Sequence, residues 1–232
     1  MRKRLSKAQW KRRRMICRSL KLSACMITLI ALVISIVYLR NSSKDKMNIL
    51  TESESNLDGL TLENGVTVKS KFLSENEYSR PGIKLKKVNG IVIHYVANPM
   101  TTAQNNRDYF EGLAISHQTY ASSHFVVGLK GEIVQCIPLN EVSYCSNNRN
   151  EDTISIEVCH PKEDGKFKKV TYKSVVELTA YLCNIYGLSE EDVIRHYDVT
   201  GKICPKYYVE HPEAWIKFKK DVKKRITKQK KK

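Results

Sequence analysis

The sequence predicts an α/β domain with a central mixed β-sheet flanked by helices, preceded by a single N-terminal transmembrane helix. Two observations predict this architecture. Strand-like and helix-like segments alternate along residues 69–222 around one hairpin pattern, which is typical of a mixed sheet covered by helices. Upstream, residues 22–39 form an apolar run of 18 residues without one charge.

The apolar run LSACMITLIALVISIVYL predicts an uncleaved membrane anchor. As a helix it would rise about 27 Å, close to the thickness of a bilayer's hydrocarbon core. It is long for the apolar part of a signal peptide, and the NSSKDK that follows shows no clear cleavage site. Residues 1–21 hold ten Lys/Arg and no acidic residue, which places the N-terminus in the cytoplasm and the rest outside the cell membrane. We therefore expect contact with the lipid bilayer through residues 22–39.

The formal net charge of +16 is concentrated at the two ends of the chain. Residues 1–21 contribute ten positive charges and residues 223–232 (KKRITKQKKK) contribute seven, so residues 22–222 sum to −1. A domain of this charge does not predict a nucleic-acid partner. The basic C-terminal tail is expected either to adhere to anionic wall polymers or lipid headgroups, or to remain solvated.

The composition divides the chain into five segments. Residues 1–21 are a basic cytoplasmic tail, and residues 22–39 are the transmembrane helix. Residues 40–68 are polar, lack a sustained apolar period, and are predicted to be an extracellular stalk. Residues 69–222 form the folded domain, and residues 223–232 the basic C-terminal tail.

The first half of the domain reads as strand, helix and hairpin. KVNGIVIHYVA (87–97) is a buried strand, and the helix after it is capped by Thr101 or Thr102 and runs to about Leu113. HFVVGLKGEIVQCIP (124–138) predicts two strands joined by a short Lys-Gly turn.

The second half reads as strand, helix, strand and helix. DTISIEVCH (152–160) alternates between two faces, and TYKSVVELTAYLCNIYG (171–187) carries apolar residues at helical spacing up to a closing glycine. VIRHY (193–197) is a short strand followed by a loop. HPEAWIKFKKDVKKRI (211–226) is a final helix with Pro212 in its first turn.

The cysteines do not form a disulfide framework. Two of the seven belong to the tail and the span, which leaves an odd number outside, in or beside apolar runs. Those five are Cys136, Cys145, Cys159, Cys183 and Cys204. Most of them are expected to be buried thiols.

Chemistry concentrates in RHYDVTGKICPKYY (195–208), where His196 and Cys204 lie eight residues apart. An imidazole and a thiolate together suit Zn²⁺, but two ligands do not make a site. His94 is the natural third candidate because it interrupts an apolar strand. Taken alone, a histidine in that position is more often a hydrogen-bonded core residue.

Four ordered segments carry a resemblance to a known family. They are GIVIHYVANP, SSHFVVG, TISIEVCHP and RHYDVTGKICPKYY, and together they resemble the zinc-dependent N-acetylmuramoyl-L-alanine amidases. This domain is shared with peptidoglycan recognition proteins and phage T7 lysozyme, and the likeness is to the Bacillus sporulation and prophage endolysin branch. The resemblance covers roughly residues 70–222 and implies the peptidoglycan recognition protein (amidase type 2) fold.

Carried over residue by residue, the resemblance implies that His94, His196 and Cys204 bind Zn²⁺. It implies catalytic roles for Glu157 and Lys202. The implied substrate is peptidoglycan, hydrolysed at the amide between N-acetylmuramic acid and L-alanine. The T7-lysozyme branch has a catalytic tyrosine where this chain has a serine just before the His-Phe pair, and Glu157 is the residue that the Bacillus-type branch uses instead.

Other polar residues near these motifs have less specific readings. Asp198 is expected to act as an N-cap or as an acceptor that orients His196. Residues 147–149, in the polar loop SNNRN, are candidates for contact with sugar or peptide. His124 either lines the cleft or is structural, and His160 is expected outside the site.

Two rival functions follow from the same residues. A non-catalytic peptidoglycan-binding receptor of this fold would bind muropeptides without hydrolysing them. A membrane protein that binds nucleic acid through its basic ends is poorly supported, because the rest of the chain is nearly neutral and shows no interleaving of basic and aromatic residues.

Overall fold

The structure is a computed structural model that describes residues 32–35 and 50–230. The predicted basic tail, 1–21, and most of the predicted transmembrane run, 22–39, lie outside the described residues. Within the described part of the chain, no helix has both the length and the apolar character needed to cross a bilayer.

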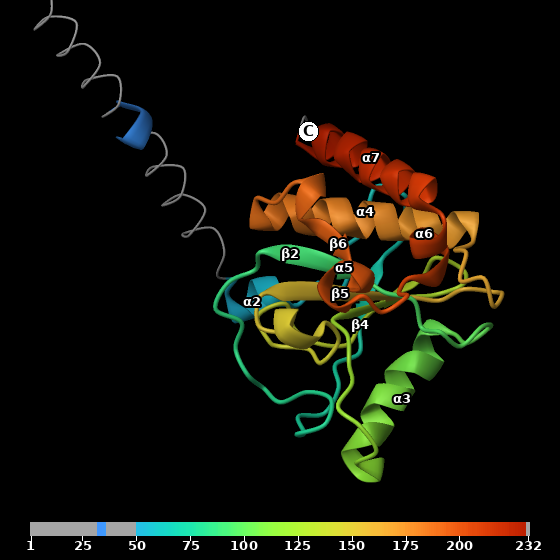
Figure 1. Ribbon diagram of the computed structural model, residues 1–232. Helices are drawn as coiled ribbons and strands as arrows, with labels where there is room; N and C mark the ends of the chain where they lie inside the picture. Colours follow the sequence, from blue (N-terminus) through green and yellow to red (C-terminus); the bar gives the residue numbers. More distant parts are fainter. Residues whose placement is uncertain (1–31, 36–49, 231–232) are drawn as a thin grey trace, which may run out of the picture. The chain divides into compact units, whose positions relative to one another are not determined.

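The domain is built on a six-stranded mixed sheet with the strand order β1-β4-β3-β5-β2-β6 (Figure 1). The strands are β1 (Val68–Ser70), β2 (Gly90–Ile93), β3 (Phe125–Val127), β4 (Ile133–Gln135), β5 (Thr153–Val158) and β6 (Val193–Arg195). Only β3 and β4 pair antiparallel, as the predicted hairpin, and the other neighbours run parallel. The predicted α/β class with a mixed sheet is confirmed.

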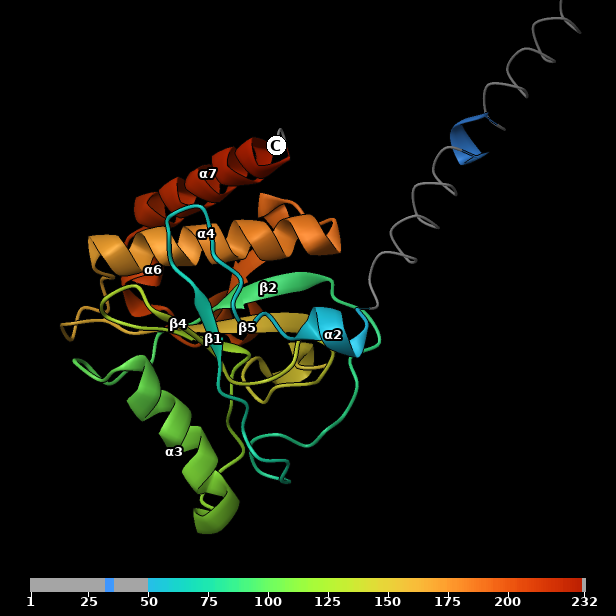
Figure 2. The same ribbon diagram turned by 180° about the vertical axis from the view of Figure 1, so that it is seen from behind.

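Helices cover both faces of this sheet. The helices are α2 (Glu52–Ser55), α3 (Ala103–Ser116), α4 (Lys169–Tyr186), α5 (His196–Thr200), α6 (Lys206–Glu210) and α7 (Pro212–Gln229), with short 3₁₀ turns at Asn147–Arg149 and Glu190–Asp192. In both views α4 lies along one face with α7 packed on it, and α3 lies on the opposite face (Figures 1 and 2). Thr102 caps α3, as one of the two predicted alternatives, and Gly187 ends α4 at a φ of 65°.

The alternation of the strands divides the interior into two cores. Ile91 and Ile93 of β2 join the larger core beneath α4 and α7, together with the even-numbered apolar residues of β5. Val126 and Cys159 belong to the smaller core on the α3 side. Residues one position away from the isoleucines of β2 and β5 therefore face α3, and this is the face on which the site is built.

The predicted stalk, 40–68, is wrong for the residues described from 50 onward. Leu57, Leu62 and Val68 are buried in the larger core, and β1 adds a parallel strand beside β4. The buried Gln135 side chain accepts a hydrogen bond from the Leu57 backbone at 2.8 Å and donates to Ser55 at 2.8 Å. Single apolar residues in a polar stretch show no period, although each one fills a specific place in the core.

The predicted C-terminal boundary at residue 222 is also wrong. Helix α7 continues to Gln229, with Val222 and Ile226 buried against α4. The buried positions Trp215, Phe218, Val222 and Ile226 recur at helical spacing across the predicted boundary. The lysines between residues 223 and 229, predicted to lie in a tail, are therefore on the solvent-exposed side of a packed helix.

Candidate active site

The parallel register of three neighbouring strands brings His94, Glu157 and His196 together. Ile93 pairs with Ile156 of β5 on one side and with Arg195 of β6 on the other. The next residue of each strand segment is His94, Glu157 or His196, so these three lie side by side across the sheet, with neighbouring strands about 4.8 Å apart. Their location agrees with the general rule that ligands bind at the carboxyl ends of parallel strands.

Cys204 reaches this row because the chain turns back after β6. His196 begins the short helix α5, and the segment after it returns so that the Tyr197 backbone N–H donates to the Cys204 carbonyl at 2.9 Å. The predicted loop between His196 and Cys204 thus contains one helical turn. The Cys204 thiol is buried, and its sulfur lies 3.8 Å from Nδ1 of His94.

The three predicted ligands form one compact donor set. One donor atom from each of His94, His196 and Cys204 lies within 4.8 Å of the other two. Burial lowers the pKa of His94 well below its ordinary value and lowers that of His196, with the Lys202 charge acting in the same direction, which favours the neutral form of both imidazoles. Burial raises the pKa of the Cys204 thiol to about 12, so a bound cation would have to displace its proton. The triad is consistent with a metal site.

Two adjacent residues hold the outer nitrogens of both histidines. Nε2 of His196 donates to Oδ1 of Asn147 at 2.8 Å, and Nε2 of His94 lies 3.2 Å from Oγ of Ser146. Asn150 fixes this turn by accepting from the Ser146 backbone N–H at 2.6 Å. These bonds leave the Nδ1 atoms of both imidazoles to face the donor set, and such outer partners orient metal ligands and set their tautomers.

Glu157 lies beside the donor set, with one of its carboxylate oxygens buried. The Cys145 thiol donates to its Oε1 at 3.8 Å, and its buried Oε2 has no hydrogen-bond partner within residues 50–230. Burial raises the pKa of Glu157 to about 7, against the opposing effects of the Lys202 charge and the Cys145 hydrogen bond. A carboxyl group with this pKa can both accept and donate a proton near neutral pH.

Lys202 supplies the positive charge of the site. It comes from the segment between α5 and Cys204, and its side chain lines the same cleft as Glu157 and the histidines. Its charge lowers the pKa of both histidines and of Glu157, so it acts electrostatically on all three groups.

A second donor set shares one histidine with the first. His94, Cys145 and Glu157 also bring ligand atoms within 4.8 Å of one another. Because both sets use His94, a metal ion bound to this histidine can occupy only one of them. All three residues of the first set are buried, and Ser146 and Asn147 contact the Nε2 atoms of its two histidines. These features favour the first set as the metal site.

The remaining sequence candidates take structural positions. Asp198 accepts from the Arg195 backbone N–H at 2.8 Å and pairs with the Arg195 guanidinium. The N-cap of α5 is therefore Arg195, and Asp198 is the third helical residue of the capping box, so neither predicted role of Asp198 is met. His124 is fully buried and hydrogen-bonded to Ser155 and to the Glu141 carbonyl, which gives it a structural role. His160, as expected, does not line the cleft.

Several residues that line the cleft were not predicted from the sequence. Cys145, read there as an ordinary buried thiol, faces Glu157, and Tyr120 and Tyr144 form part of the wall. Of the polar loop 147–149, Asn147 reaches the site, where it holds His196. No periodic signal marks these positions, because all of them lie in loops.

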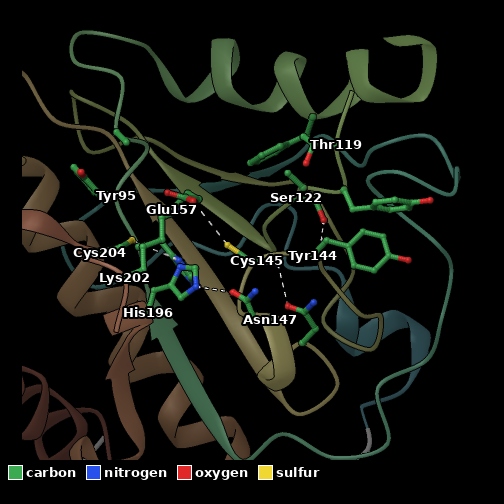
Figure 3. Close-up of a pocket in the computed structure, with 16 residues that line it drawn as sticks. Tyr95, Thr119, Ser122, Tyr144, Cys145, Asn147, Glu157, His196, Lys202 and Cys204 are labelled. Atoms are coloured by element: carbon green, nitrogen blue, oxygen red, sulfur yellow. Dashed lines mark hydrogen bonds between the residues drawn. The ribbon is translucent and has the colours of Figure 1, made fainter. Parts of the chain in front are cut away.

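These side chains share one cleft of about 500 Å³ (Figure 3). The close-up shows Cys204, Lys202 and His196 on one side, Glu157 and Cys145 in the middle, and Thr119, Ser122 and Tyr144 on the other side. The five residues predicted for metal binding and catalysis therefore converge on one end of an open groove that continues beyond them.

The comparison with protein families supports the same interpretation. The family described as N-acetylmuramoyl-L-alanine amidase matches residues 84–207, a range that contains all five predicted site residues. The chain belongs to this amidase family. The predicted resemblance is thereby confirmed.

Curated relatives agree with this assignment. The chain is 42% identical over 170 residues to the N-acetylmuramoyl-L-alanine amidase CwlL of Bacillus licheniformis, and 36% identical over 179 residues to the amidase BlyA of Bacillus subtilis strain 168. Each alignment covers 68% of this chain and 47% of the relative, so the chain spans about half the length of these curated relatives. Among solved structures, a mutant endolysin from Bacillus subtilis superposes with a TM-score of 0.58 at 28% identity, over 68% of this chain and 99% of that one.

Proposed function

We propose that this chain is a zinc hydrolase that cleaves the amide between the lactyl group of N-acetylmuramic acid and L-alanine in peptidoglycan. The observation that carries the proposal is the convergence of a His-His-Cys donor set, a carboxyl group of raised pKa and a lysine at one end of a cleft. Membership of the amidase family and the names of CwlL and BlyA support the choice of bond.

The donor set suits zinc in particular. Two imidazole nitrogens and one sulfur form a donor set found in catalytic zinc sites, and tetrahedral zinc separates a nitrogen from a sulfur ligand by about 3.5 Å. The separation between Nδ1 of His94 and the Cys204 sulfur is 3.8 Å. A zinc ion held by His94, His196 and Cys204 would supply Lewis acidity toward the scissile carbonyl and lower the pKa of a water molecule.

Glu157 and Lys202 would divide the remaining chemistry. Glu157 takes a proton from the attacking water and delivers it to the departing L-alanine amine, and its pKa near neutrality suits both transfers. Lys202 places a positive charge where the carbonyl oxygen becomes negative, which stabilises the transition state.

The proposal is tested by incubating the full chain with purified peptidoglycan, with a chelator and after zinc is restored. We expect whole stem peptides with new L-alanine amino termini, released from intact glycan strands in a zinc-dependent manner and identified by mass spectrometry. Glu157→Gln should retain zinc and lose at least about a hundredfold in rate. Cut glycan or cut stem peptides would assign another bond.

The rival of the same fold is a peptidoglycan receptor without activity. It predicts saturable muropeptide binding with no released amino groups, in both the wild type and Glu157→Gln. The two functions are therefore separated by the same digestion.

We also propose that residues 22–39 anchor the enzyme in the cell membrane with the catalytic domain outside. The length of the uncharged run and the ten basic residues before it support this orientation. The chain should stay with membranes through a high-salt wash and release the domain when intact protoplasts are treated with protease. Release of the intact chain by salt, or protection of the domain from protease, would contradict the proposal.

The C-terminal basic residues are proposed to contact anionic wall polymers. On α7, Lys217, Lys220, Lys224 and Lys228 are exposed and recur at helical spacing on the side away from the core. Within the described residues, Lys220 and Lys224 have no ion-pair partner. Lys220→Glu with Lys224→Glu should weaken binding of the full chain to teichoic-acid-bearing walls, with no loss for walls stripped of those polymers.

A further inference from the structure

The cleft continues beyond the predicted catalytic residues to an end walled by aromatic side chains. Tyr120, Tyr144 and Thr119 line this end, together with the edge of α3. Figure 3 shows Thr119 and Tyr144 on the far side of Cys145 from Cys204 and Lys202. Tyr144 directly precedes Cys145, whose thiol touches Glu157, so its Cα lies only about 3.8 Å from that of a residue beside the reaction centre.

The two tyrosine rings are held rigidly. Their centroids lie 5.6 Å apart with planes at 88°, and Tyr78 stacks against Tyr120 at 5.0 Å. His117 stacks on Tyr78 in turn at 4.3 Å, which makes a supported platform. The Tyr120 hydroxyl donates to the Glu77 carboxylate at 2.8 Å, so the ring cannot swing out of the wall without losing this bond.

Tyr120 is nevertheless 52% exposed. An aromatic ring that is fixed in place, presented to solvent and set in a cleft is a prepared binding surface, because little side-chain entropy is lost when a ligand covers it. The backbone N–H of Ser122 donates to the Tyr144 carbonyl at 3.0 Å, and this bond keeps the two segments that carry the tyrosines together.

The charges along the cleft indicate which end would take the stem peptide and which end the glycan. Lys202, beside the metal donors, is the cation among the residues that line the cleft, whereas the charged group at the other end is the Glu77 carboxylate that accepts from the Tyr120 hydroxyl. A stem peptide carries carboxylates and is attracted to Lys202. An N-acetylhexosamine is uncharged, and the C–H face of its ring suits an aromatic surface.

We propose that Tyr120 and Tyr144 form a glycan subsite in which the exposed Tyr120 ring stacks on the uncharged N-acetylhexosamine next to the muramic acid and the Tyr144 ring, at 88° to it, borders that sugar, while the stem peptide leaves over Lys202. The inference rests on the proposed amidase function and adds to it the direction in which the strand lies. The subsite makes the enzyme selective for stem peptides still attached to a glycan strand over those attached to a single muramic acid.

The test compares two substrates in the zinc-loaded full chain: a disaccharide stem peptide and the corresponding muramic acid stem peptide without the neighbouring sugar. The wild type should show the lower KM for the disaccharide. Tyr120→Ala should raise that KM about tenfold, or about 1.4 kcal/mol, with kcat and the monosaccharide KM unchanged. Tyr120→Phe keeps the ring and should stay within about twofold of the wild type.

An equal change for both substrates, or no change for either, would overturn the glycan subsite. Cleavage of neither substrate by the wild type would instead refute the amidase function, so the two failures are distinguishable. Because Tyr120 is half exposed, the variant is expected to keep the fold, and circular dichroism checks this.

A binding measurement gives a second readout without turnover. Calorimetric titration of the full chain with chitotriose, a neutral N-acetylglucosamine trimer, should give saturable binding that Tyr120→Ala and Tyr144→Ala each weaken about tenfold. Tyr109, also 52% exposed, lies on α3 and does not line the cleft, so Tyr109→Ala is the matched control. The inference is refuted if the wild type does not bind the trimer or if all three variants bind it equally.

Discussion

Asn147 offers a sharp test of how the donor set is held together. Its Oδ1 accepts from Nε2 of His196 at 2.8 Å, and this bond leaves Nδ1 as the nitrogen available to a metal. Asn147 has a φ of 53°, in the left-handed region, so alanine would add backbone strain while glycine removes the side chain without it. Asn147→Gly therefore isolates the loss of the hydrogen bond.

The expected effect follows from that single interaction. Loss of an outer hydrogen bond to a ligating histidine typically weakens metal binding about 10- to 100-fold, which corresponds to about 1.4–2.7 kcal/mol. Competition with a chromophoric chelator at fixed pH gives the zinc dissociation constant of the full chain. Activity at saturating zinc should fall much less than activity at limiting zinc.

Asn148→Gly is the matched control. The neighbouring Asn148 is exposed and makes no hydrogen bond to His94 or His196 among the described residues. The Asn148→Gly variant should therefore bind zinc with the affinity of the wild type. Wild-type affinity in Asn147→Gly, or equal losses in the two variants, would refute the idea that Asn147 positions His196.

Further substitutions test the electrostatics of the site and the boundaries of the domain. The Lys202 charge lowers the pKa of Glu157, so in zinc-loaded enzymes Lys202→Met should move the acid limb of the kcat/KM profile to higher pH; an unmoved limb would contradict the coupling. Leu57→Ala should reduce the free energy of unfolding, measured with urea, by about 2–4 kcal/mol, whereas a residue in a stalk would cost almost nothing. Ile226→Ala should cost a similar amount, and Ile216→Ala on the exposed side of the same helix less than about 0.5 kcal/mol; equal effects would place the end of the packed helix before 226.

Periodicity predicted five of the six strands and the three long helices, whereas the full donor set came from the family resemblance. Apolar runs mark β2 and β5, helical spacing marks α4, and His94 is conspicuous because a polar ring interrupts a buried strand. The sequence could also place His196 and Cys204 in one local segment, since they lie eight residues apart.

Features that depend on register and on loops were not predictable in this way. The row of His94, Glu157 and His196 exists because β2 pairs with β5 and β6 in one particular register, which no local pattern encodes. Ser146 and Asn147 hold the histidines from a loop about 50 residues distant from either in sequence, so only the fold reveals their role.

The central claim is that His94, His196 and Cys204 bind one zinc ion, and X-ray absorption on the zinc-loaded full chain tests it most directly. We expect one sulfur at about 2.3 Å and nitrogen or oxygen ligands at about 2.0–2.1 Å. The sulfur should disappear in Cys204→Ser and remain in Cys145→Ser. A sulfur that persists in Cys204→Ser and is lost in Cys145→Ser would place the ion on the other donor set and contradict the account.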